Sequence, residues 1–146
     1  MAFERDLAIA CGIVKPRYMQ LEKSVSLYDQ LQKGIPPKFR SGRADRSDLK
    51  SILSDVQLGC PDAQCFVFLS HHWFMGGIEL RISAFWIKAL DLLDFDGDTV
   101  FAVSHDGRDG IALDFDTEPV ERGGGYEIIV WGDRWQDFGP PGRPLP

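Results

Sequence analysis

The second half of the chain contains three apolar runs that are separated by clusters of aspartate and glycine. The runs cover Thr99 to Ser104, Gly110 to Phe115 and Tyr126 to Trp131, and apolar residues recur in them with a period of two. This period places one face of a strand in the core, and Asp-Gly clusters are typical of tight turns. The stretch from Leu93 to Trp135 is therefore predicted to be a three-strand meander.

The N-terminal part of the chain follows a helical period instead. Phe3 to Cys11 is predicted to be a short helix that ends before Lys15 and Pro16, because a residue that precedes proline is disfavoured in a helix. Arg17 to Lys33 carries an apolar stripe at steps of three and four residues and is predicted to be a longer helix. Asp48 to Gln57 carries a third stripe of the same kind.

The middle of the chain mixes both periods. Cys65 to Leu69 is a continuous apolar run that predicts a buried strand, and Ile78 to Ile82 predicts a second strand after the Gly76-Gly77 turn, so the two form a hairpin. Phe85 to Leu93 fits a helical step and is predicted to be a helix. Ile35 to Arg46 is basic and has no clear period, which predicts a solvated loop.

These elements indicate an α+β fold, in which N-terminal helices pack on a mainly antiparallel sheet built from a hairpin and a C-terminal three-strand meander. The chain has 146 residues, of which 44% are hydrophobic, and this suits one hydrophobic core. We expect a single domain over residues 1–135 and a proline-rich C-terminal tail over residues 136–146. Glu4, Arg5 and Asp6 argue against a secretory signal sequence, so we expect a cytoplasmic protein.

Charge is unevenly distributed along the chain. Residues 1–60 carry ten Lys and Arg against seven Asp and Glu, whereas residues 61–146 carry six against fifteen, within a formal net charge of -6. From Asp91 to Glu121 there are ten acidic residues and one basic residue, Arg108. Binding to nucleic acid needs clustered Lys and Arg. The second half of the chain is therefore better suited to a basic partner than to nucleic acid.

The three cysteines are odd in number, which does not suggest a disulfide framework. Cys60 and Cys65 lie near His71 and His72 in the sequence, and thiolates and imidazoles are preferred zinc ligands. The two histidines are adjacent, however, and adjacent residues of a strand point to opposite faces. We therefore expect Cys11, Cys60 and Cys65 to be small buried hydrophobic residues, and we assign no metal and no other cofactor.

Asp94, Asp96 and Asp98 are spaced like the first ligands of a calcium-binding loop. Counting from Asp94, the sixth position is Thr99, where the loop needs glycine, and the twelfth is His105, where it needs a glutamate. A helix-loop-helix calcium site is therefore not expected.

His105 and Asp106 have the residue types of a general base and its carboxylate partner. The residues from Ser104 to Gly110 are also typical of a polar turn between strands, and no nucleophile motif accompanies them. We assign no catalytic residue. The alternative function is a small metal-dependent hydrolase that uses His71, His72 and His105 with neighbouring Asp residues.

The predicted meander also carries a set of short family motifs. These are a strand at Phe101-Ala102-Val103, a polar glycine-containing turn from His105 to Gly110, a strand that ends in Leu113-Asp114, and a strand that ends in Val130-Trp131-Gly132-Asp133. Together they resemble the core of the SUKH superfamily over residues 93–133. The resemblance implies a non-enzymatic bacterial immunity protein that binds a cognate toxin, often a nuclease, inside the producing cell.

We expect an acidic partner-binding surface on the turns of the meander, which would attract a basic toxin protein. The residues expected to form it are Asp94, Asp96, Asp98, Asp106, Asp109, Asp114, Asp116, Glu118, Glu121 and Trp135. A solvated face that only limits aggregation would account for the same charges. A phage-type inhibitor that imitates nucleic acid would present them as well. No contact with a membrane is expected.

Overall fold

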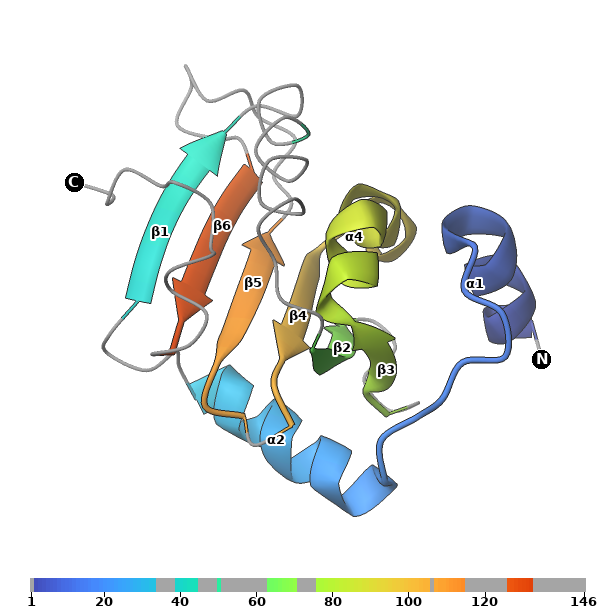
Figure 1. Ribbon diagram of the computed structural model, residues 1–146, viewed down its shortest axis with the longest axis horizontal. Coiled ribbons are helices and arrows are strands. Elements are labelled where there is room, and N and C mark those ends of the chain that lie inside the picture. Colours follow the sequence, from blue (N-terminus) through green and yellow to red (C-terminus); the bar gives the residue numbers. More distant parts are fainter. Residues whose placement is uncertain are drawn as a thin grey trace.

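The computed structural model describes residues 2–33, 39–44, 50, 63–70, 76–105, 107–114 and 126–132. Its helices are α1 (Ala2–Cys11), α2 (Leu21–Lys33) and α4 (Ile82–Asp96). Its strands are β1 (Phe39–Ala44), β2 (Gln64–Leu69), β3 (Ile78–Arg81), β4 (Thr99–Val103), β5 (Gly110–Asp114) and β6 (Tyr126–Trp131). Figure 1 shows these strands side by side, with α1 beyond α4 at one side of the molecule.

All six strands belong to one sheet, in the order β1-β6-β5-β4-β2-β3. Every neighbouring pair is antiparallel. The hairpin of β2 with β3 and the meander of β4, β5 and β6 confirm the sequence prediction, as does the α+β class. The helix predicted over Phe85 to Leu93 is confirmed within α4, which leads the chain from the outer strand β3 to β4.

One face of the sheet packs against α4, and α1 packs against α4 in turn. Leu7 of α1 and Phe85 and Leu93 of α4 are fully buried there, together with strand residues such as Val67 and Ile111. The strand residues on this face alternate with residues on the other face, as the period of two requires. The main hydrophobic core of the protein therefore lies between α4 and the sheet.

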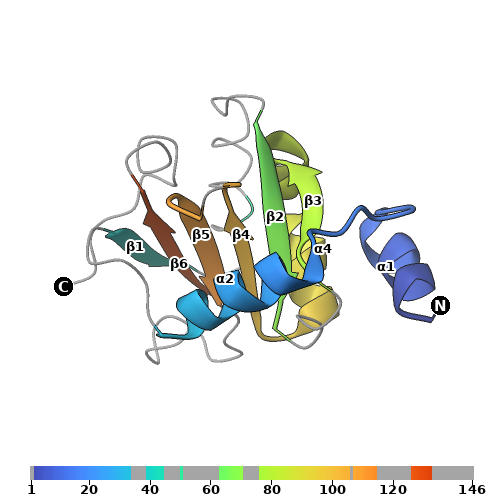
Figure 2. The ribbon, with the colours of Figure 1, turned by 90° about the horizontal axis from the view of Figure 1, so that it is seen from below.

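The opposite face of the sheet packs against α2. Tyr28 of α2 lies over Phe68 of β2, with ring centroids 6.2 Å apart, and Phe66 and Trp131 belong to the same buried cluster. Figure 2 shows α2 running across the strands. β2 therefore has a core on both faces, which explains why its sequence is continuously apolar.

The prediction of a solvated loop over Ile35 to Arg46 is wrong, because β1 lies within this range. This strand pairs with β6 over its full length, from Phe39 opposite Trp131 to Ala44 opposite Tyr126. β1 is the outermost strand of the sheet, and backbone hydrogen bonds alone can hold such a strand. An outer strand needs no alternation of apolar residues, so the periodicity of the sequence did not reveal it.

The predicted helix over Arg17 to Lys33 begins four residues later than expected, at Leu21. Residues 17–19 instead bind the outer edge of β3. The N–H of Met19 donates to the carbonyl of Gly77 at 2.6 Å, and the N–H of Glu79 donates to the carbonyl of Arg17 at 2.7 Å. This extended segment covers the edge that β3 would otherwise present for strand pairing.

The two described cysteines are buried free thiols, as expected for small hydrophobic residues. Burial raises the pKa of the Cys11 thiol to about 11 and that of Cys65 to about 12. Cys60, the predicted helix over Asp48 to Gln57 except Lys50, and the tail over residues 136–146 lie outside the described residues. In the part of the chain that is described, no helix has the length and apolar character needed to cross a membrane.

Candidate functional site

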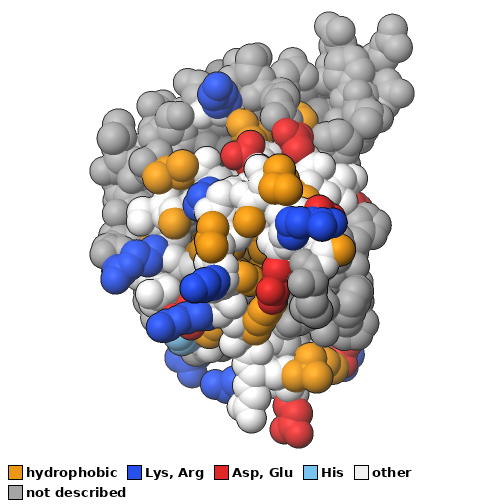
Figure 3. All heavy atoms as spheres, turned by 90° about the vertical axis from the view of Figure 1, so that its right-hand side faces the viewer, with side chains coloured by type: hydrophobic (Ala, Val, Ile, Leu, Met, Phe, Trp, Pro, Cys, Tyr) orange, Lys and Arg blue, Asp and Glu red, His pale blue; other side chains and the backbone are white. Residues whose placement is uncertain are grey.

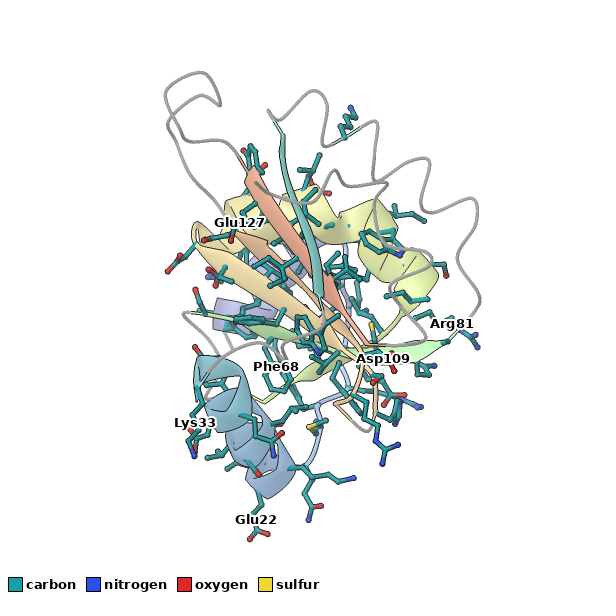
Figure 4. The ribbon with its side chains drawn as sticks, turned by 90° about the vertical axis from the view of Figure 1, so that its left-hand side faces the viewer. Glu22, Lys33, Phe68, Arg81, Asp109 and Glu127 are labelled. Atoms are coloured by element: carbon teal, nitrogen blue, oxygen red, sulfur yellow. The ribbon has the colours of Figure 1, made fainter. Side chains whose placement is uncertain are left out.

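The described residues of the predicted acidic surface lie at two opposite ends of the sheet. Asp114 at the end of β5 lies beside Thr99 at the start of β4, whereas Asp109 precedes the start of β5. At about 3.3 Å per residue, these ends are about 13 Å apart. Figure 4 shows Glu127 near one end and Asp109 near the other. We name the first the acidic end, formed by Asp94, Asp96, Asp98, Asp114 and Glu127. We name the second the turn end, formed by residues 104–105 and 107–110 with Trp131 and Gly132.

The C-terminus of α4 supplies the first part of the acidic end. Asp94 is exposed in the last turn of this helix, and Gly97 closes the helix with a φ of 76° and an N–H that donates to the carbonyl of Leu93 at 2.7 Å. The last turn contains no basic residue. Because unpaired carbonyl groups make a helix C-terminus negative, carboxylates there add to a negative potential and favour a cation nearby.

Strands β4, β5 and β6 supply the second part. The hydroxyl oxygen of Thr99 lies 3.0 Å from Asp114 Oδ1 and 3.3 Å from Asp98 Oδ1, and its single proton can be donated to one carboxylate at a time. Asp114 is directly opposite Glu127 in the β5-β6 register, so the two side chains share a face. Arg43 of β1 is the register partner of Glu127 on its other side. Like charges in direct opposition destabilise a strand pair.

The prediction that Asp96 belongs to the acidic surface is wrong, because this residue is buried. It has 6% relative exposure and accepts a hydrogen bond of 2.6 Å from the Ser70 hydroxyl at the end of β2. Its position explains this burial, since it follows Leu92 and Leu93 at steps of four and three and so extends the core-facing stripe of α4. Asp96 therefore joins α4 to the sheet and presents no carboxylate to a partner.

The prediction for Asp109 is also wrong. This residue lies at the turn end and has only 1% relative exposure. Its N–H donates to Ser104 Oγ at 3.1 Å, and its carbonyl accepts the Ser104 N–H at 2.9 Å. A Cβ atom on Gly132, which has a φ of 97°, would overlap the carboxylate and the backbone of Asp109. Asp109 is thus enclosed between the turn and the end of β6, and it is not part of a surface.

The turn end does not bring together a catalytic arrangement within the described residues. His105 is exposed, and its ring packs against Phe66 with centroids 4.5 Å apart. Ser104 is buried and bonded to Asp109 across the turn. Asp106, the proposed carboxylate partner of His105, lies outside the described residues.

Carboxylates at the acidic end do not form a metal site in the described ranges. Across those ranges, no three His, Cys, Asp or Glu side chains are placed to hold one ion. Asp94 and Asp98 are exposed while Asp96 points into the core, so the three do not converge. The chemistry that this end offers is attraction of a positively charged group by carboxylates.

We compared the chain with models of protein families, with curated proteins and with solved structures. No match was found in any of the three. The SUKH-like motifs of the meander stay a prediction from the sequence.

Several of the predicted site residues lie outside the described part of the chain. They are Asp106, Asp116, Glu118, Glu121 and Trp135, and the same holds for His71 and His72 of the alternative hydrolase. Asp116, Glu118 and Glu121 belong to the connection between Asp114 and Tyr126, the ends of two neighbouring strands.

Sequence reasoning missed Glu127 of the acidic end. It also missed Ser70 and Thr99, whose hydroxyl groups bond to carboxylates of this end. Glu127 is the second residue of a correctly predicted strand, and its signal was the pairing of that strand with the one that ends at Asp114. The connection between those strands is long, so the sequence did not define their register. The roles of Ser70 and Thr99 depend on the same tertiary pairing and left no local signal.

Proposed function

We propose that this chain is a non-enzymatic binding protein that neutralises a basic bacterial toxin through its acidic end. The observation that supports this most is the close approach of two carboxylates, those of Asp98 and Asp114, to one hydroxyl group. Neither carboxylate forms an ion pair within the described residues. Asp94 stands in the last turn of α4, where the helix itself is already negative.

A basic partner would relieve this repulsion on binding. Lys or Arg side chains placed between the carboxylates would replace like-charge contacts with charge-assisted hydrogen bonds. The carboxylates come from a helix end and from paired strands, so little ordering is needed when a partner arrives. A negative surface also speeds the encounter with a positive protein.

The choice of a toxin as the partner rests on the SUKH-like motifs. Toxins that act on nucleic acid need a basic surface for phosphate groups, and an acidic protein can cover such a surface. The same reasoning applies to an inhibitor that imitates nucleic acid, which therefore remains the second member of this class. The hydrolase alternative has no support from the contacts of His105.

The experiment is a pull-down between the purified chain and the protein encoded by the neighbouring gene, followed by titration at low and high salt. The test variant is Asp94→Lys/Asp98→Lys/Asp114→Lys. The matched control is Asp6→Lys/Glu22→Lys/Asp29→Lys, which changes the net charge by the same amount at exposed positions of α1 and α2. Buried Asp96 and Asp109 are left unchanged, so that folding is not tested by mistake.

We expect the test variant to bind at least about tenfold more weakly at low salt, and the control to lose much less. The difference should shrink as salt rises, because salt screens exposed charges. Equal losses in both variants would show that only net charge matters and that the acidic end is not the interface. Absence of binding by the wild-type chain would remove the neighbouring gene product as the partner.

A further inference from the structure

Helix α1 packs as a separate unit against the outer side of α4. Leu7 and Cys11 are buried in this contact, and the rings of Phe3 and Phe95 lie 5.9 Å apart. The ammonium group of Lys88 donates to the carbonyl of Cys11 at 2.9 Å, which satisfies one of the carbonyl groups at the end of α1. The position α1 occupies on α4 is thus specific, and without a helix it would expose a hydrophobic surface.

The connection between α1 and the sheet is strained at Lys15. This residue has a φ of 50°, which is disfavoured for any residue with a side chain. It also precedes Pro16, and a residue before proline strongly prefers an extended conformation. Lys15 is the one residue other than glycine with a positive φ in the described ranges. Straightening residues 14–16 would relieve this strain.

Beyond this connection the chain is fixed again. Residues 17–19 hold the edge of β3 through the two backbone bonds of Arg17 and Met19, and Tyr18 forms a β-bridge with Ile78. Ile13 is buried in the main core, and Gly12 is bonded to Ala8 at the end of α1. Residues 14–16 therefore form a hinge between two well-anchored parts, the docked helix and the sheet edge. Figures 1 and 2 both show α1 standing to the side of the sheet, joined by this connection.

The hinge and the outer side of α1 also expose apolar residues. Ile9 is 79% exposed and Val14 is 70% exposed, which is unusual for large hydrophobic side chains. Figure 3 shows the side of the molecule where α1 lies, with hydrophobic side chains at its surface among charged ones. An extended hinge could bury Val14 against the hinge of a second copy.

We propose that α1 exchanges between two copies of this chain, so that each α1 docks on the α4 of the other copy and a two-fold dimer forms. Such a dimer keeps every contact of the docked helix, including the 3.0 Å hydrogen bond from the Tyr18 hydroxyl to Glu4. It differs from the monomer mainly in the hinge, where the strain at Lys15 is released. This inference is independent of the proposed toxin binding.

Two opposite substitutions at Lys15 test the exchange. Lys15→Gly removes the cost of a positive φ and should raise the dissociation constant of the dimer about tenfold or more. Lys15→Val increases that cost and favours an extended hinge, so it should lower the same constant. The measurement is light scattering after size-exclusion chromatography over a range of concentrations. Pro16→Ala, which frees Lys15 from the proline, should act in the same direction as Lys15→Gly.

A cross-linking measurement shows whether the helix itself is exchanged. Phe3→Cys/Phe95→Cys, in a background with Cys60→Ser, places one thiol on α1 and one on α4, while Cys11 and Cys65 are buried. A short bifunctional thiol reagent should join two chains in the dimer fraction and give only an internal link in the monomer fraction. Internal links in both fractions, or a monomer at every concentration for wild type and Lys15→Val alike, would overturn the proposal.

Discussion

The turn end and the acidic end lie on the same strands, about 13 Å apart, and differ in how their polar groups are satisfied. At the turn end, Ser104 and Asp109 bond to each other and are almost fully buried. At the acidic end, Asp94 and Asp98 are exposed, and Asp114 faces Glu127 across the β5-β6 pair. The first end is closed by the protein itself, whereas at the second Asp98 and Asp114 form no ion pair among the described residues.

This difference shows that the density of aspartate along a chain does not define a surface. Asp109 and Asp98 look equivalent in the sequence, since both lie in a polar stretch between regular elements. One is enclosed by Gly132 and bonded to Ser104, while the other meets solvent and Thr99. Stability should therefore depend on the turn end, and interaction with charged partners on the acidic end.

The sharpest test of this comparison uses one glycine from each end, since Gly132 and Gly97 both have a positive φ. Gly132→Ala should lower the free energy of unfolding by about 3 kcal/mol or more. The new Cβ would overlap the backbone of Asp109, and the alanine would also be held at an unfavourable positive φ. Gly97→Ala has nothing within 4 Å of its Cβ and should lose only about 1–2 kcal/mol. Denaturant titrations of both variants provide the measurement. Equal losses would mean that the turn end is not tightly closed.

Much of the fold could be predicted from the sequence, because the buried strands and helices carry regular periods. The meander and the β2-β3 hairpin follow from alternation, and α4 follows from steps of three and four. β1 could not be predicted in this way, since an outer strand paired through its backbone needs no apolar face. The start of α2 was also missed, because bonds from Arg17 and Met19 to β3 are long-range contacts.

The candidate site was less predictable than the fold. Asp94, Asp98 and Asp114 lie at the acidic end as charged, partly or fully exposed groups. The burial of Asp96 has a signal in the sequence, namely its spacing from Leu92 and Leu93, which was outweighed by its place in an Asp-rich run. The burial of Asp109 has none, because it depends on Gly132 of a different strand approaching the turn.

A smaller effect on stability is expected when one aspartate from each end, Asp109 or Asp98, is replaced by alanine. Asp109→Ala should lower the free energy of unfolding by about 2 kcal/mol, because it disturbs a closed turn in which neighbouring polar groups are buried. Asp98→Ala should leave stability almost unchanged, since it removes an exposed charge from a like-charged group. Thermal and denaturant unfolding of the two variants measure both values. A larger loss for Asp98 than for Asp109 would reverse the assignment of the two ends.

The smallest expected effect is that of the α4 carboxylates on the pKa of Cys11. Burial is the main cause of the raised pKa of Cys11, about 11, and the negative charges of Asp91 and Asp94 add to it. Cys65 has its pKa raised to about 12 by burial alone. Removing a nearby negative charge makes the thiolate easier to form, so Asp94→Asn should lower the pKa of Cys11, and Asp91→Asn should lower it further. At pH 9, alkylation of Cys11 should then become faster by at most about threefold.

The rate at Cys65 is the internal control, because burial raises its pKa and no charge from the described ranges adds to that. Peptide-resolved mass spectrometry measures both rates in one sample, and unfolding curves of each variant exclude faster opening of the core as the cause. If alkylation of Cys11 becomes faster and that of Cys65 does not, the carboxylates of α4 raise the pKa of Cys11 through a short-range electrostatic interaction. Attraction of a cation by the acidic end requires an interaction of this kind. If both thiols keep their wild-type rates, solvent screens these carboxylates already in the free protein, and attraction of a basic partner would have to rely on Asp98, Asp114 and Glu127.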